Sequence, residues 1–319
     1  MNSAFYNGKP IASIAALSSA LNVPEDILID MSHNANKYYK KNRPEIKSNG
    51  KERIHYSVSE SLKAIHQRIK VILFQNVTYP EYLQGSIRDT KKTRDYISDA
   101  RMHSGKRMLI SEDVSDFFPS IKYDQVLKLW MYFFNFPKKI ATTLTDLTTY
   151  KGFLPQGSKT SSYVANLIFW QYEPALYNKL KAQGITYSRY VDDTTLSFDR
   201  YVSDKELGQI ISSIFGMMCQ VNIKPNREKQ DIKSRKNNTT VHNLNVTKKS
   251  PTIPKKKKNN LRMAVFNCIK HSDLHGRKSE TYKKMYRSTI TRVGQLGRLH
   301  PNQSQKLKDK LAPYKPFNS

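Results

Sequence analysis

Apolar and β-branched residues occur in short runs in the middle of this chain, and these runs predict β-strands. One run is Met108 to Ile110, and two others lie at residues 185–188 and 194–198. Asp192 and Asp193 lie between the last two runs. The pattern therefore predicts a β-hairpin that carries two adjacent acids at its turn.

The N-terminal region shows helical periodicity instead. One amphipathic stretch is followed by Pro24, Glu25 and Asp26, which suit the first turn of a second helix. The predicted apolar positions are Ile11, Ile14, Ala15 and Leu17 in the first stretch and Leu28, Ile29 and Met31 in the second. We interpret the pair as an accessory helical layer packed on the rest of the chain, in preference to a helix-turn-helix DNA reader.

The acid pair has an upstream counterpart. Asp113 follows the strand predicted at residues 108–110 and precedes Asp192 by 79 residues, which leaves room for helices between two strands of one sheet. Acids that converge from separate strands form the two-metal sites of phosphoryl transfer. A solvated turn is the alternative for Asp192 and Asp193 taken alone, whereas the three acids together indicate nucleotidyl transfer.

Several motifs agree in order and spacing with one enzyme family. They are the stretch Asp113 to Phe118; the run Leu154, Pro155, Gln156, Gly157 and Ser158; its continuation Ser161, Ser162, Ala165, Asn166 and Leu167; the run Tyr190 to Asp193; and the pair Asn226 and Lys229. In this arrangement the chain resembles a reverse transcriptase, and within that family the retron type of bacteria. The resemblance covers roughly residues 50 to 245.

The resemblance implies an α+β, right-hand polymerase fold, with fingers and a palm built from an antiparallel sheet plus helices, and a helical thumb. The implied divisions follow the chain. They are an N-terminal helical segment at 1–45, part of the fingers at 46–110, the palm with the remaining fingers elements at 111–245, and a basic helical thumb at 246–319 that binds RNA and the template–primer duplex.

The resemblance also implies roles for single residues. Asp113, Asp192 and Asp193 would be the catalytic acids, and with the main-chain carbonyl of Val114 they would bind two Mg²⁺ ions. Phe118 would be a steric gate that excludes a ribose 2′-hydroxyl, whereas Phe117 is the better candidate for a core aromatic. The remaining nucleotide-binding residues would be Arg53, Asp116, Gln156, Gly157 and Lys229.

Some of these residues also have a plainer interpretation. Gly157 would let the nucleotide or template base approach closely, because it lacks a side chain, but Pro-Gln-Gly is also typical of an ordinary turn before a helix. Arg53, which shares with Tyr56 and Lys63 the spacing of an early basic segment, would grip the triphosphate as a bidentate donor. Lys229 would protonate or stabilise the leaving pyrophosphate, or be a surface lysine.

Two short elements distinguish retron enzymes within the family. The first, Asn-Ala-x-x-His, corresponds here to residues 99–103, where Asp99 replaces the Asn. The second, Val-Thr-Gly, has its nearest counterpart at Val241, His242, Asn243 and Leu244, a poor match. His103 and His242 are interpreted as capping or surface histidines, since neither has the clustered partners of a zinc site.

Charge points independently to nucleic acid. The chain carries a net charge of +28, and residues 233–319 hold 22 Lys and Arg against three acids. A helix is predicted around Leu261, Val265 and Ile269, and the lysine run before it is interpreted as a linker that follows Pro251 and Pro254. The predicted nucleic-acid-binding residues are Lys248, Lys249, Lys255, Lys256, Lys257, Lys258, Arg262, Tyr282, Lys283, Tyr286 and Arg287, the tyrosines by stacking.

Other features limit the function. Three widely spaced acids after Asp231 are too few for an RNase H site, so we expect no such domain. We find no signal peptide and no apolar run long enough to span a bilayer, and Cys219 and Cys268 are the two cysteines. A bacterial cytoplasmic enzyme without a membrane partner is expected.

The leading hypothesis is a retron RNA-directed DNA polymerase. By resemblance, it would copy a structured noncoding RNA into a DNA that stays joined to that RNA (msDNA), use deoxynucleoside triphosphates, and act with an effector protein in antiphage defence. One alternative is another defence-associated reverse transcriptase that primes from protein or synthesises untemplated DNA. The other is a noncatalytic nucleic-acid-binding scaffold.

Overall fold

The structure, a computed structural model, describes residues 2–46, 50, 52–89, 92–226, 231–234 and 239–317, and it confirms a mixture of helices and sheet. The α-helices are α1 (Ile14–Leu21), α2 (Glu25–His33), α3 (Glu60–Ile72), α4 (Tyr96–Met102), α5 (Phe117–Ser120), α6 (Tyr123–Lys128), α7 (Lys138–Thr148), α8 (Ser161–Leu167), α9 (Glu173–Ala182), α10 (Asp204–Gln220), α11 (Lys255–His275), α12 (Glu280–Gly297) and α13 (Pro301–Leu311). None of these described helices is long and apolar enough to cross a bilayer.

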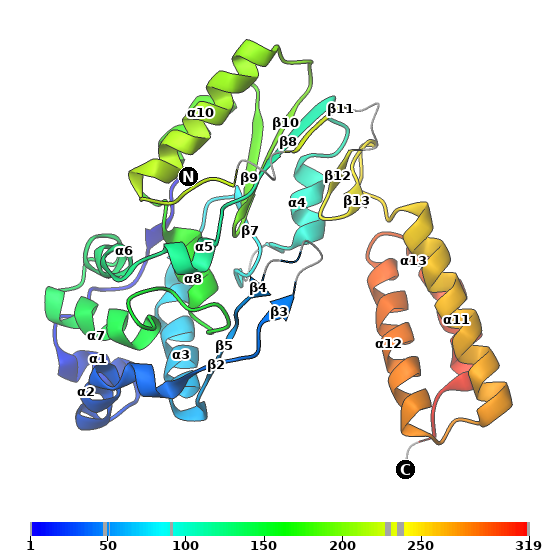
Figure 1. The fold of residues 1–319 in the computed structure, drawn as a ribbon, viewed down its shortest axis with the longest axis horizontal. Coiled ribbons are helices and arrows are strands. Elements are labelled where there is room, and N and C mark those ends of the chain that lie inside the picture. Colours follow the sequence, from blue (N-terminus) through cyan, green and yellow to red (C-terminus); the bar gives the residue numbers. More distant parts are fainter. Residues whose placement is uncertain are drawn as a thin grey trace.

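The strands form one five-stranded sheet and several two-stranded pairs (Figure 1). The large sheet has the order β11 (Asp231–Ser234), β8 (Met108–Glu112), β10 (Asp193–Phe198), β9 (Thr186–Tyr190) and β7 (Leu83–Gln84). The pairs are β1 (Phe5–Tyr6) with β6 (Val77–Thr78), β2 (Tyr39–Lys41) with β5 (Tyr56–Val58), β3 (Glu45–Ile46) with β4 (Glu52–Arg53), and β12 (Thr240–Val241) with β13 (Leu244–Asn245).

The predicted hairpin and its neighbouring strand are confirmed. Tyr190 pairs with Asp193 across β9 and β10, which leaves Val191 and Asp192 as a two-residue turn. On its other side β10 pairs antiparallel with β8. The prediction of an antiparallel sheet is wrong at one edge, where β7 runs parallel to β9, because the chain between them makes a long crossover that contains helices.

The N-terminal helices begin close to where the apolar pattern places them. The Ser13 hydroxyl caps α1 by accepting a hydrogen bond from the Ala16 amide at 3.1 Å. Glu25 and Asp26 occupy the first turn of α2, where the helix dipole favours acids. Both helices contact α7, and α1 also contacts α3. The pair thus forms a packed layer, as the apolar pattern predicts.

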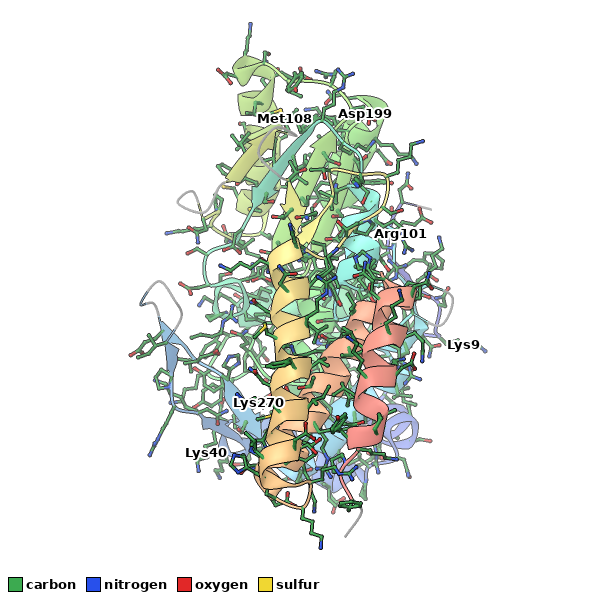
Figure 2. The ribbon with its side chains drawn as sticks, turned by 90° about the vertical axis from the view of Figure 1, so that its right-hand side faces the viewer. Lys9, Lys40, Arg101, Met108, Asp199 and Lys270 are labelled. Atoms are coloured by element: carbon green, nitrogen blue, oxygen red, sulfur yellow. The ribbon has the colours of Figure 1, made fainter. Side chains whose placement is uncertain are left out.

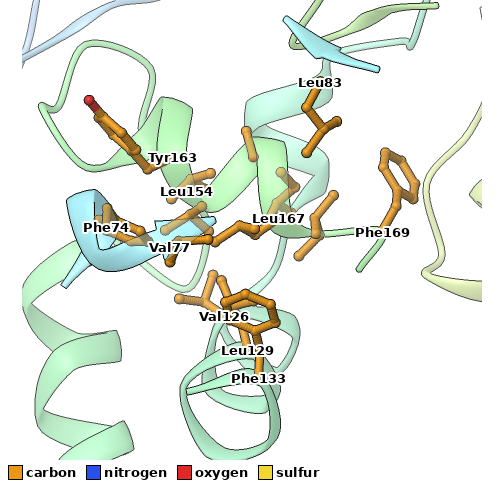
Figure 3. Close-up of a cluster of buried hydrophobic side chains, with 14 of the residues drawn as sticks. Phe74, Val77, Leu83, Val126, Leu129, Phe133, Leu154, Tyr163, Leu167 and Phe169 are labelled. Atoms are coloured by element: carbon orange, nitrogen blue, oxygen red, sulfur yellow. The ribbon is translucent and has the colours of Figure 1, made fainter. Parts of the chain in front are cut away.

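The main hydrophobic core lies beneath this layer and extends to the sheet. Figure 3 shows part of it, where Phe74, Leu129 and Leu167 converge from separate elements. Trp130, in the π-helix Leu129–Phe133, is fully buried against the Phe74 ring at 5.2 Å between centroids. A core assembled from so many segments fixes the relative positions of the loops at the carboxyl end of β8 and before α8.

Helices α11 to α13 form a separate unit beside the rest of the molecule (Figure 1), with its own core. Figure 2 looks onto this unit, with Lys270 of α11 toward the viewer. The predicted linker at Lys255–Lys258 is wrong, because these lysines form the first turn of α11 behind Pro254 at the N-cap. Pro254 is accommodated there because an N–H group at the start of a helix would have no carbonyl partner within the helix.

Two histidines are completely buried and link distant elements. The His66 imidazole donates a hydrogen bond to the Leu147 carbonyl at 2.7 Å and lies 3.1 Å from the Ser158 hydroxyl. The Nδ1 atom of His103 lies 2.7 Å from the Ser197 hydroxyl, and its Nε2 atom lies 2.7 Å from the Ser188 hydroxyl. Burial lowers the pKa of each histidine to about 4. His103 also ends α4, so its capping role is confirmed and its surface position is wrong.

We expect acid to destabilise the fold through these two histidines. In the unfolded chain they take up protons near pH 6.5, whereas in the fold they do so only near pH 4. The free energy of unfolding should therefore fall as pH drops from about 6.5 to about 4, by up to about 1.4 kcal/mol per pH unit for each histidine. Urea unfolding at several pH values measures this slope.

The matched control is the same substitution at a buried and an exposed histidine. His103→Asn should reduce the slope, whereas His275→Asn, at an exposed position, should leave it unchanged. Equal slopes in wild type and His103→Asn would show that His103 does not cause the acid sensitivity.

Candidate active site

A cavity of about 380 Å³ opens between the end of β8, the β9–β10 turn and the β3–β4 hairpin. It brings together most of the predicted site residues from five separate segments of the chain. Its lining includes Arg53, Asp113, Val114, Asp116, Phe118, Gln156 and Asp192. Asp193 and Gly157 do not line it, and Lys229 lies outside the described residues. Phe153, which has no role in the sequence analysis, also lines the cavity, as does Tyr56, which was named there only for its spacing from Arg53.

The chain leaves β8 in a conformation fixed by main-chain contacts. The Asn226 amide donates to the Asp113 carbonyl at 2.9 Å, and the Ser115 amide donates to the Lys224 carbonyl at 3.2 Å. These bonds flank a bridge between Val114 and Pro225, and neither uses the Val114 carbonyl. The backbone that carries Asp113 is thereby held without engaging that carbonyl.

The turn that carries Asp192 is strained. Val191 has a φ of 60°, a conformation that is unfavourable for a β-branched residue. Such a residue costs on the order of 1–3 kcal/mol and persists only where its surroundings hold it. Here the Arg189 guanidinium donates to the Val191 carbonyl at 2.8 Å from the preceding strand.

Arg189 is itself fully buried and bound on every side. It pairs with both carboxylate oxygens of Glu173, at 2.7 and 2.8 Å, and donates to the Asn166 carbonyl at 2.7 Å. Burial on its own lowers the pKa of the guanidinium, but the charge and hydrogen bonds of Glu173 outweigh it and raise that pKa. The Phe169 ring covers the guanidinium at 5.0 Å. One charged group thus joins the turn to α8 and α9.

The two adjacent phenylalanines after β8 have different environments, in agreement with the interpretation from the sequence. Phe117 is 3% exposed, and its ring stacks with Phe169 at 6.0 Å between centroids. Phe118 is half-buried and lines the cavity. Asp116, with a φ of 44°, makes the left-handed turn that separates Asp113 from these rings.

The missing side chain of Gly157 serves a different purpose from the predicted one. Its φ is 118°, and a Cβ atom there would lie 2.6 Å from the Tyr56 carbonyl oxygen. The Tyr56 amide in turn donates to the Gln156 carbonyl at 2.8 Å. Gly157 therefore admits the backbone of β5, rather than a nucleotide, and this contact holds the segment that carries Arg53 beside the cavity.

The carboxylates of the three predicted acids suit hard divalent cations, which prefer oxygen ligands. Asp113 and Asp192 line the same cavity, whereas Asp193 is exposed beside it. Across the described residues, no three His, Cys, Asp or Glu side chains form a group that could bind a metal ion. The donor types therefore fit a divalent cation, and two of the three predicted acids share one cavity.

The predicted nucleic-acid surface needs correction in the C-terminal unit. The stacking roles of Tyr282 and Tyr286 are wrong, because their rings are 0% and 9% exposed within the three-helix core. Their hydroxyls donate to the carbonyls of Tyr314 and Leu311. Lys283 is partly buried and paired with Glu280 at 2.9 Å. The exposed members of the predicted set are Lys248, Lys249, Lys255, Lys256, Lys257, Arg262 and Arg287.

The two elements near Asp99 and His242 meet in space. The His242 imidazole is 2.6 Å from a carboxylate oxygen of the fully buried Asp99, across 143 residues of sequence. His242 is thus not a free surface histidine. Sequence reasoning missed this pair, because no local pattern indicates a contact across 143 residues.

Comparison with known proteins is consistent with this geometry. Residues 39–252 match the family described as reverse transcriptase (RNA-dependent DNA polymerase). The chain is 33% identical to the retron Se72 reverse transcriptase of Salmonella heidelberg, over 99% of this chain and 83% of that protein. It is 28% identical to the retron Ec48 reverse transcriptase of Escherichia coli, over 97% and 78% of the two chains.

Replacing Gly157 tests the contact with β5. Gly157→Ala should lower the free energy of unfolding by about 1–3 kcal/mol, because it adds a clash with Tyr56 to an unfavourable φ. The control is Gly152→Ala, which has a φ of 80° but no atom within 4 Å of the added Cβ, and so isolates the conformational cost. Equal losses in urea unfolding would contradict the close contact.

Proposed function

Because this chain belongs to the reverse transcriptase family and is an RNA-directed DNA polymerase of the retron type, we propose that it copies a structured noncoding RNA into DNA at the cavity between β8 and the β9–β10 turn. The observation that carries this proposal is the convergence of Asp113, Asp192 and Arg53 on that one cavity. The DNA product would stay joined to the RNA as msDNA.

The acids at the cavity would bind the metal ions of the reaction. Asp113, Asp192 and Asp193, with the carbonyl of Val114, would hold two Mg²⁺ ions, which when bound activate the attacking hydroxyl and stabilise the departing pyrophosphate. The strained turn at Val191 directs Asp192 toward the cavity. The geometry at Val114 supports the use of its carbonyl, since the flanking main-chain bonds do not engage it.

Other residues of the cavity would select and orient the deoxynucleotide. Arg53 would donate two hydrogen bonds to the triphosphate, and Asp116 would lie beside it. Phe118, which lines the cavity with part of its ring accessible, would exclude a ribose 2′-hydroxyl. Gln156 would contact the nucleotide from below, supported by Gly157 through the β5 contact. Lys229 would act on the leaving pyrophosphate.

The C-terminal unit would be the thumb that holds the RNA and the template–primer duplex, with the five-stranded sheet as the palm and the β2–β5 region in the fingers. A second cavity, of about 420 Å³, lies where this unit meets the β12–β13 hairpin. Lys257, Lys258 and Arg292 line it, and the described residues of its lining include no Asp or Glu. Such a surface would attract phosphates.

The position of four lysines supports nucleic-acid binding independently. Lys255 to Lys258 occupy the N-terminal turn of α11, where the helix dipole disfavours cations, and that turn contains no acid. The arrangement costs stability in the free protein and is repaid when phosphates lie beside it. Lys248, Lys249, Arg262 and Arg287 would extend this surface. An effector protein would accompany the enzyme in antiphage defence.

DNA synthesis by purified enzyme tests the proposed site. With Mg²⁺, deoxynucleotides and the cognate RNA, Asp113→Asn and the double variant Asp192→Asn, Asp193→Asn should each lose activity by roughly a hundredfold or more. Asp124→Asn, an exposed acid outside the cavity, should retain it. If these variants synthesise as much DNA as the wild type, the proposed site is contradicted. If the wild type binds RNA in a salt-sensitive way but synthesises no DNA, a noncatalytic scaffold is favoured.

Mapping the 5′ end of the product separates the two enzymatic alternatives. A 5′ end joined to the RNA supports the retron reaction. A 5′ end on a tyrosine would support a protein-primed defence enzyme, and DNA without a template sequence would support untemplated synthesis.

A further prediction is that removing lysines from the start of α11 stabilises the free protein. Lys255→Gln with Lys256→Gln should raise the free energy of unfolding at low salt by about 0.3–1 kcal/mol per lysine, because it removes cations from the positive end of the helix. The same variant should reduce the slope of log K for RNA binding against log salt by about 0.7–0.9 for each lysine that contacts a phosphate.

The matched control is Lys308→Gln with Lys310→Gln, in the last turn of α13, where the dipole favours cations. This variant should lose stability at low salt. If both double variants change stability in the same direction, the helix dipole does not explain the α11 lysines. An unchanged salt slope for the α11 variant would remove these lysines from the RNA interface.

A further inference from the structure

The Tyr190 ring, at the end of β9, has two close neighbours. A Cβ atom at Gly85 would come within 2.7 Å of the ring. The imidazole of His242 packs on the same ring, with 4.4 Å between the ring centroids. Asp192 follows two residues later, and Val191 between them is strained. The position of this ring therefore bears directly on the position of the turn.

Both neighbours are themselves held in place. The Gly85 carbonyl accepts a hydrogen bond from the Asn166 amide group at 3.1 Å, and the Gly85 amide donates to the Arg94 carbonyl. His242 lies 2.6 Å from Oδ2 of Asp99, a fully buried carboxylate. The other oxygen of Asp99 has no hydrogen-bond partner among the described residues and is 4.0 Å from Nε2 of His103. His242 is thus the close partner of a buried carboxyl group.

The backbone at His242 is shaped to make this contact. His242 and Asn243 form the two-residue turn between β12 and β13, and both have positive φ, 49° and 61°. Val241 and Leu244, on either side of the turn, are buried against Ile97 and Ala100 of α4. The hairpin is therefore anchored on the helix that carries Asp99. Backbone strain in non-glycine residues persists where the surroundings enforce it.

We propose that Asp99 and His242 form a positioning pair that holds the Tyr190 ring against Gly85 and thereby fixes the turn that carries Asp192. The proposal deepens the proposed function and rests on it for the role of Asp192. Asp99 orients the imidazole through a short hydrogen bond, and the imidazole supplies the surface against which Tyr190 packs.

The first experiment reads the contact without catalysis. With 3-fluorotyrosine incorporated at Tyr190, the ¹⁹F resonance of the full chain should shift on His242→Gln, which keeps a donor for Asp99 but removes the aromatic ring. Asn243→Gly, which suits a φ of 61° and leaves the contact intact, is the matched control and should keep the resonance. The same resonance in His242→Gln and wild type would overturn the proposal, whether or not the chain makes DNA.

The second experiment measures the consequence for DNA synthesis. Asp99→Ala, His242→Ala and His242→Gln should each lower kcat about tenfold while the KM for deoxynucleotide changes less than about threefold, because Tyr190 does not line the nucleotide cavity. The double variant Asp99→Ala, His242→Ala should fall no further than either single variant, since the two residues act as one unit.

A purely structural role would lower the thermal midpoint and leave kcat intact at temperatures well below it. Wild-type kcat in His242→Gln, or additive losses in the double variant, would therefore overturn the positioning pair. If the wild type itself synthesises no DNA, the proposed function is refuted. The ¹⁹F experiment would still decide whether His242 positions Tyr190.

Discussion

The buried ion pair between Arg189 and Glu173 is the interaction on which the active-site geometry depends. It joins β9, α8 and α9 through one guanidinium and holds the carbonyl of the strained Val191. Taking two charges out of water is costly, and such a pair is retained where every donor is used. Removing one partner would leave a buried charge and cost about 3–5 kcal/mol. The strain of the turn is thus offset by a rigid group just outside the cavity.

Main-chain contacts extend this rigidity to the other walls of the cavity. Asn226 holds the backbone of Asp113, and Gly157 admits the backbone of Tyr56. Each contact joins segments that are far apart in sequence. Backbone atoms cannot change rotamer, so they place the functional side chains more accurately than side-chain packing alone. The residues that touch the nucleotide in our proposal are therefore few, whereas those that hold them in place are many.

The sequence predicts what depends on short-range pattern. The β9–β10 hairpin, the strand before Asp113 and the N-terminal helices follow from local periodicity and turn residues, and the residues around the 380 Å³ cavity follow from ordered motifs. Long-range contacts were not predictable. Tyr282 and Tyr286 are spaced four residues apart on a helix, and that spacing is the same whether the rings face a core or a ligand. Gly157 meets a backbone about 100 positions earlier, and Asp99 meets His242 across 143 residues. The linker prediction for Lys255 to Lys258 rested on the prolines before them, and Pro254 instead caps the helix that these lysines begin.

In the proposed complex, that unfavourable helix start would link the amount of enzyme to the amount of its RNA. A ligand that binds the folded chain stabilises it in proportion to the logarithm of the free ligand concentration over the dissociation constant. Where the free chain carries cations and no acid in the first turn of α11, the unbound form is the one that unfolds and is degraded first. Cells that synthesise more protein than RNA would therefore lose the surplus. The stoichiometry of the complex would be set by turnover, without a separate regulator.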